Sequence, residues 1–132
     1  MTPHERLFDF NYHKELLKIA EGDLESAKSL NKSKQGRLEN IFFLAEQAIE
    51  KALKAVLCHQ KKPVPFSHDL GLLVGLLNTT PGIPFSRELP DLTQHATVRR
   101  YEEGNYQPTL QECEGILTIS QEVLDWAKRI CK

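Results

Sequence analysis

Two stretches of the chain gather residue types that bind anions. Between Lys51 and His68 there are four lysines, two histidines and no acidic residue. The second stretch is Arg99–Tyr101, where two arginines precede a tyrosine. Guanidinium groups can bind phosphate through paired hydrogen bonds, and an aromatic ring offers a stacking face for a base. The candidate ligand-binding residues are Lys51, Lys54, His68, Arg99, Arg100 and Tyr101.

A purely structural interpretation of the same residues remains open. Lys51 and Lys54 can pair with Gln47 or Glu50 one helical turn earlier, which would make them surface support for a helix. The two arginines would suit the negative end of a helix dipole. Between Glu102 and Asp125 the charge is reversed, with six acids and no base, so the pattern also fits an unevenly charged surface.

His68 and Asp69 do not form a catalytic pair, because adjacent residues on a helix point in different directions. Ser67 has the character of an N-cap, and Asp69 would then occupy the first turn and favour the positive end of the dipole. His68 can pack against the neighbouring loop or contact a ligand. Both roles remain open.

Other site chemistries find no support in the sequence. The glycines are isolated, so no phosphate-binding loop of the Walker or Rossmann type is present. Cys58, Cys113 and Cys131 are odd in number and far apart, which fits neither a disulfide framework nor a zinc site. We therefore expect no metal and no cofactor, no catalytic residue of a recognised type, and a reducing cytoplasmic location.

The bulk composition is that of one soluble domain. The chain has 132 residues, of which 40% are hydrophobic and 27% are charged. The formal net charge of -1 argues against a general nucleic-acid coat. The apolar runs are too short to span a bilayer, and the N-terminus lacks the apolar region of a signal peptide. We expect a single domain over residues 1–132, with its core over about 11–130, and no membrane association.

Helical periodicity dominates the chain, and no segment alternates like a strand. The longest amphipathic helix is expected from about Gly36 to His59. It carries one apolar seam that builds the bundle, and a second stripe predicts contact on a second side, with a second bundle or a dimer mate. The seam comprises Leu38, Phe42, Ala45, Ile49, Ala52 and Val56, and the second stripe comprises Phe43, Leu53 and Leu57.

Four further helices are expected around this one, over about 11–31, 68–78, 90–100 and 109–130. The last begins with a capping box, Thr109 to Glu112, and Leu110 is expected to face inward. Short connections favour sequential antiparallel packing. The predicted fold class is an all-α, up-and-down four-helix bundle with an additional short helix.

Four motifs, taken in order, resemble those of the HEPN domain family. Each alone is an ordinary amphipathic pattern, but their order and spacing extend over about Asn11 to Ile130. The motifs are Ala20–Ala27, Phe43–Ala55, Ser67–Leu70 and Arg100–Tyr101.

This resemblance implies a four-helix bundle, usually a homodimer, that handles nucleotides or RNA. It also implies a role beside a minimal nucleotidyltransferase, often in a toxin–antitoxin pair. Some members of the family are ribonucleases that use an arginine followed a few residues later by a histidine. Here Arg100 is followed by Asn105 instead, and no histidine follows His95.

Three functions follow from these observations. The favoured one is a nucleotide-binding accessory protein that partners a minimal nucleotidyltransferase and is more a binding module than an enzyme. One alternative is a metal-independent ribonuclease toxin that uses Arg100 with Asn105 and Tyr106, although asparagine cannot exchange a proton as histidine does. The other alternative is a dimerisation scaffold without a ligand.

Overall fold

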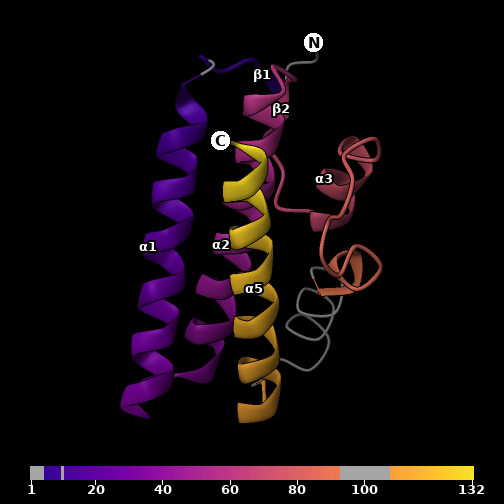
Figure 1. The fold of residues 1–132 in the computed structure, drawn as a ribbon. Helices are drawn as coiled ribbons and strands as arrows, with labels where there is room; N and C mark the ends of the chain where they lie inside the picture. The colour runs from indigo at the N-terminus through magenta and orange to yellow at the C-terminus, as the bar shows by residue number, and fades with distance from the viewer. Residues whose placement is uncertain (1–4, 10, 93–107) are drawn as a thin grey trace.

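Three long helices lie side by side and form the body of the molecule (Figure 1). The structure is a computed structural model that describes residues 5–9, 11–92 and 108–132. The helices are α1 (Tyr12–Ser33), α2 (Leu38–His59) and α5 (Leu110–Ile130). The all-α fold class is confirmed, and the predicted bounds of these helices agree to within two residues at each end.

Helix α2 is the centre of the core, because it packs against α1, α5 and the short helix α3 (Leu70–Leu76). The predicted seam is buried along most of its length, with Leu38 and Phe42 only half-buried. Leu53 and Leu57 of the second stripe are also fully buried inside this chain, whereas Phe43 remains 49% exposed. The expectation of a second bundle or a dimer mate is therefore wrong for Leu53 and Leu57, which belong to this chain's own core, and of the second stripe only Phe43 remains for contact with another molecule.

The turn between α1 and α2 depends on left-handed backbone conformations. Lys34 ends α1 with a φ of 59°, and Gly36 follows with a φ of 82°. Glycine adopts such a conformation without the steric cost that a side chain brings. The chain can therefore reverse within a few residues, so that α1 and α2 pack as neighbours.

Helix α3 is shorter than predicted, and its N-cap is Asp69 rather than Ser67. The Asp69 carboxylate accepts hydrogen bonds from the backbone N–H groups of Gly71 (2.9 Å) and Leu72 (3.4 Å). Ser67 instead accepts a hydrogen bond from the Asp69 N–H. The carboxylate reaches the first turn of the helix better than the more distant hydroxyl, which explains why the prediction of Ser67 was wrong.

A minimal antiparallel ladder closes one end of the bundle. Strand β1 (Glu5–Arg6) pairs with β2 (Val64–Pro65), with Glu5 opposite Pro65 and Arg6 opposite Val64. Strands of this length are too short to show an alternating pattern, so the sequence did not predict them. The ladder fixes the start of the chain against the loop between α2 and α3.

Helix α5 begins at the predicted capping box. The Thr109 hydroxyl accepts from the Glu112 N–H, and the Glu112 carboxylate accepts from the Thr109 N–H, both at 3.0 Å. Leu110, expected to face inward, is exposed. It lies in the first turn, before α5 is covered by its neighbours. The buried hydroxyl of Ser120 donates to the Ala45 carbonyl oxygen of α2, so a polar group in the core is satisfied.

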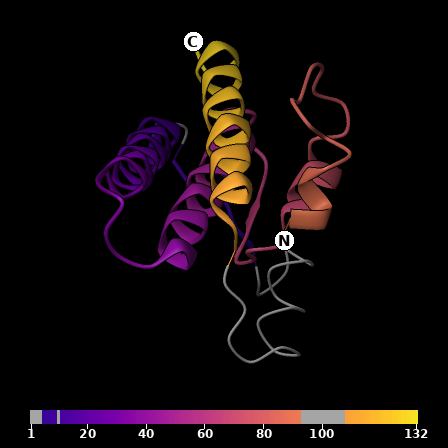
Figure 2. The same cartoon turned by 90° about the horizontal axis from the view of Figure 1, so that it is seen from below.

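Helix α3 and the segment that follows it lie to one side of the three long helices (Figure 2). Trp126 of α5 holds this segment through a hydrogen bond of 3.1 Å from its indole N–H to the Pro81 carbonyl oxygen. Residues 89–92 are helical, close to the predicted start at Pro90. The remainder of that predicted helix lies outside the described residues. Among the described residues, no helix combines the length and apolarity needed to cross a membrane.

Candidate functional site

A buried carboxylate on α2 gathers three of the predicted ligand-binding residues. The Glu50 side chain is only 2% exposed. One of its oxygens lies 3.1 Å from the Nζ atoms of both Lys51 and Lys54, and the other lies 2.7 Å from Nδ1 of His68. His68 belongs to the loop before α3, so the cluster joins two separate elements.

Helical spacing explains why the lysines meet at Glu50. Lys54 lies one turn after Glu50 and therefore shares its face of α2. Lys51 is adjacent in sequence, and its flexible side chain contacts both Glu50 and, at 3.1 Å, the Oε1 atom of Gln47. The Asp69 cap fixes the start of α3, which holds the preceding residue, His68, beside α2.

Glu50 is ionised in the folded protein. Burial alone would raise its pKa, but the hydrogen bond from His68 and the charges of Lys54 and Lys51 outweigh burial, so the pKa is lowered. An ionised carboxylate only accepts hydrogen bonds, so Nδ1 of His68 is the donor in this pair.

A second acid on α1 lies within the electrostatic reach of this cluster. The pKa of Asp23 is raised, mainly by burial and in part by the charge of Glu50, while Lys51 acts in the opposite direction. Asp23 of α1 therefore interacts electrostatically with Lys51 and Glu50 of α2. The site carries buried negative charge that the lysines must balance.

The lysine ends lie nearer the surface than the Glu50 carboxylate that they contact. Lys51 and Lys54 carry two positive charges against the single charge of Glu50, and Asp23, which interacts with both Glu50 and Lys51, offsets the difference when it is ionised. The side chains are exposed to different degrees: 23% for Lys51, 12% for Lys54 and 79% for His68. We define this group, Glu50, Lys51, Lys54 and His68, as the Glu50 cluster. Its chemistry suits a small anion that contacts His68 and the lysine ends.

Half of the predicted ligand-binding set converges in this cluster. Lys51, Lys54 and His68 lie together, whereas Arg99, Arg100 and Tyr101 lie outside the described residues. The contacts expected of the lysines as helix support are present, because Lys51 contacts Gln47 and Lys54 contacts Glu50, while ligand binding by these residues stays a prediction. The two interpretations are compatible, since paired lysines can still present part of their charge to a ligand.

Glu50 itself was not among the predicted site residues. The sequence contains a signal for it, because Glu50 lies between buried positions of α2, at Ile49 and Ala52. A charged residue at such a position is rarely buried without partners. Glu50, which contacts Lys51, Lys54 and His68, thus lies directly before the acid-free stretch from Lys51 to His68.

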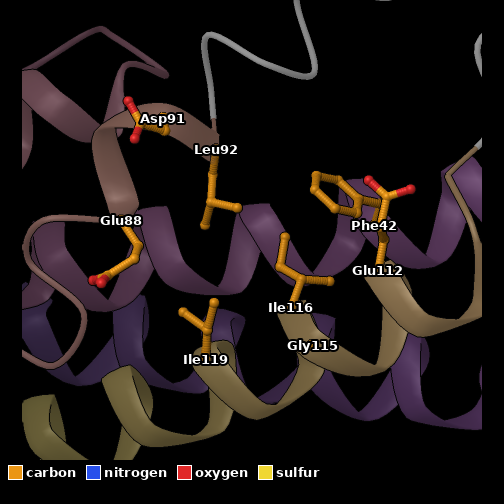
Figure 3. A pocket seen from close by; sticks show the side chains of 8 residues that line it. All are labelled: Phe42, Glu88, Asp91, Leu92, Glu112, Gly115, Ile116 and Ile119. Carbon is orange, nitrogen blue, oxygen red and sulfur yellow. The ribbon is translucent and has the colours of Figure 1, made fainter.

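A separate hollow lies between α5, the first half of α2 and the segment that follows α3 (Figure 3). Its volume is about 350 Å³. In Figure 3 the apolar side chains of Leu92, Ile116 and Ile119 converge on the hollow, and Phe42 closes one end. The described residues that line it are Phe42, Glu88, Asp91, Leu92, Glu112, Gly115, Ile116 and Ile119.

One end of the bundle holds a pair of histidine rings. His13 of α1 is buried, and its ring lies edge-on to the His59 ring of α2 with 4.9 Å between centroids. The pKa of His59 is lowered by burial and by the neighbouring His13. Among the described residues, no group of three or more His, Cys, Asp or Glu side chains is arranged to hold a metal ion.

Comparison with known proteins assigns the class of this molecule. The HEPN domain family model matches residues 13–130, nearly the whole chain, and the match spans the three long helices and the Glu50 cluster. The chain belongs to the HEPN domain family. Searches of curated proteins and of solved structures returned no significant match.

Proposed function

We propose that this chain is a nucleotide-binding accessory protein of the HEPN family that acts beside a minimal nucleotidyltransferase. The observation that carries the proposal is the convergence of Lys51, Lys54 and His68 on Glu50. A phosphate group can accept hydrogen bonds from the lysine and imidazole nitrogen atoms of this cluster, and hydrogen bonds to charged groups are among the stronger polar interactions in proteins.

The cluster is organised more for binding than for cleavage. Glu50 is committed to two lysines and a histidine, which keeps their nitrogen atoms close together before any ligand arrives. Pre-organised side chains lose less conformational entropy on binding. The role beside a nucleotidyltransferase, in a toxin–antitoxin pair, and the homodimeric state come from the family resemblance and are part of the same proposal.

Calorimetric titration with ATP, GTP and inorganic phosphate tests the binding site. We expect saturable heat with the unaltered chain and affinity lowered about ten-fold in His68→Gln and in Lys51→Gln, because each loses one charge-assisted contact. Lys14→Gln, an exposed lysine on α1, is the matched control and should bind as the unaltered chain does. Absence of heat with all three ligands would contradict the proposed binding site.

The partnership needs its own experiment. The chain is co-expressed with a minimal nucleotidyltransferase, and the mixture is resolved by size-exclusion chromatography. Co-elution of the two chains at a mass greater than either alone is the expected result. Separate elution at micromolar concentrations would contradict the accessory role while leaving nucleotide binding to be judged by calorimetry.

A further inference from the structure

The hollow beside α5 has a chemistry opposite to that of the Glu50 cluster. Its walls are apolar, and the described residues that line it include three acids and no base. Figure 3 shows the aliphatic side chains lining the centre of the hollow, while the carboxylates of Glu88 and Asp91 point away from that centre and the Glu112 carboxylate lies beside Phe42. The described part of the lining therefore favours a neutral or cationic occupant over an anionic one.

We infer that this hollow is a second binding site, for a small organic cation with an apolar body. The volume of about 350 Å³ lies at the lower end of the range, roughly 300–1,000 Å³, that holds small molecules. Phe42, Leu92, Ile116 and Ile119 would cover the apolar body of the ligand. The carboxylates at the edge would attract its ammonium group by charge complementarity.

The absence of a side chain at Gly115 helps to keep the hollow open. Gly115 lies within α5, between Leu110 and Ile130, and lines the hollow. Apart from the adjoining residues and the backbone of its own helix, no atom lies within 4 Å of the place where a Cβ atom would be added. A larger residue can therefore be introduced here without a clash at its Cβ atom, and the rest of its side chain would occupy the hollow.

This property gives a clean test. Gly115→Leu should fold, because leucine favours a helix more than glycine does. Gly22→Leu on α1 is the matched control, since Gly22 is also within a helix and, with the same exceptions, has no atom within 4 Å of an added Cβ. Circular dichroism and the melting temperature confirm that both variants are folded before any binding experiment.

The probes are phenethylammonium, phenethyl alcohol and phenylacetate, which share an aromatic body but differ in charge. Binding is followed by chemical-shift changes in NMR titrations. We expect phenethylammonium to bind most tightly and phenylacetate most weakly. Asp91→Asn should lower the affinity for phenethylammonium roughly two- to five-fold and leave the affinity for phenethyl alcohol unchanged. Gly115→Leu should abolish binding of all three, whereas Gly22→Leu should not.

Two results would overturn the inference. One is that phenylacetate binds as tightly as phenethylammonium, which would remove the role of the carboxylates. The other is that Gly115→Leu still binds the ammonium, which would place binding elsewhere. A peptide with phenylalanine between lysines is also titrated. If it binds in a Gly115-dependent manner while phenethylammonium does not bind, the hollow receives a protein segment and the small-molecule site is wrong.

Discussion

Glu50 stabilises the fold and organises the candidate ligand site at the same time. Its carboxylate is nearly inaccessible to water, and its two oxygens contact two lysines and one histidine. Removing one partner of a buried charge group is costly, because the remaining charges lose their compensation. Lys51 and Lys54 retain some exposure, so water can partly replace Glu50 around them.

We predict that Glu50→Ala lowers the free energy of unfolding by about 3 kcal/mol, the lower end of the range for breaking a buried ion pair. Urea denaturation at neutral pH measures this change. Glu25→Ala, at an exposed position of α1, is the control and should change stability by less than about 0.5 kcal/mol. Equal effects of the two substitutions would show that the Glu50 contacts contribute little to stability.

His59 makes the stability of the protein depend on pH. Burial and the neighbouring His13 lower its pKa from 6.5, so the unfolded chain binds more protons than the folded chain at pH values just below 6.5. Stability therefore rises with pH across this window and is lost as the pH falls. Glu50 acts in the same direction at lower pH, below its usual pKa of 4.5, whereas Asp23, with a raised pKa, opposes it.

His59→Gln is predicted to make stability less dependent on pH just below 6.5, because glutamine does not titrate. The melting temperature of the variant and of the unaltered chain, measured in steps from neutral pH downward, gives the comparison. His68→Gln, on the exposed ring of the Glu50 cluster, serves as a second histidine variant. Parallel pH profiles for His59→Gln and the unaltered chain would contradict the assigned role of His59.

At the scale of the elements, the start of α5 depends on the capping box. Thr109→Ala removes the hydroxyl that accepts from the Glu112 N–H and should destabilise the protein by about 1 kcal/mol. Thr118→Ala, on an exposed part of the same helix, is the matched control and should be nearly neutral. Thermal unfolding of both variants gives the difference, and a neutral Thr109→Ala would mean that the cap contributes nothing.

The long helices could be predicted because their signals are local. Apolar spacing defined α1, α2 and α5, and the Thr109 and Glu112 pair fixed the start of α5. The start of α3 was less predictable, because Ser67 and Asp69 are both residues that cap helices. The ladder of β1 and β2 could not be predicted, since its pairing joins residues far apart in the sequence over a length too short for a pattern.

At the scale of the whole molecule, α2 makes the fold cooperative. It contacts α1, α3 and α5, and its buried side chains lie in one continuous core. Leu53→Ala is predicted to lower the free energy of unfolding by about 2–5 kcal/mol, because it leaves a cavity in this core. Leu110→Ala, at an exposed apolar position, should have a much smaller effect.

The unfolding transition itself checks this prediction. In Leu53→Ala and in Leu110→Ala, the unfolding curve measured by fluorescence of Trp126, the single tryptophan, should coincide with the curve measured by far-ultraviolet circular dichroism. Separate curves would indicate that α5 unfolds independently of the remaining helices. In that case α2 would not hold the molecule together as one unit.

Only part of the candidate site could be predicted from the sequence. Residue types identified Lys51, Lys54 and His68, and helical spacing indicated that Lys54 reaches Glu50. The approach of His68 to α2 depends on how α3 packs, which is a tertiary contact with no local signal. The hollow beside α5 was not predicted either, because its lining comes from three separate segments of the chain.

The central claim, that the Glu50 cluster binds nucleotides, is tested most directly by mapping amide chemical shifts during titration with ATP. The account predicts the largest changes at Glu50–Lys54 and Ser67–Asp69, with the amides of Ile116 and Ile119 beside the acidic hollow unchanged. Changes confined to α5, or no saturable change at any amide, would contradict it.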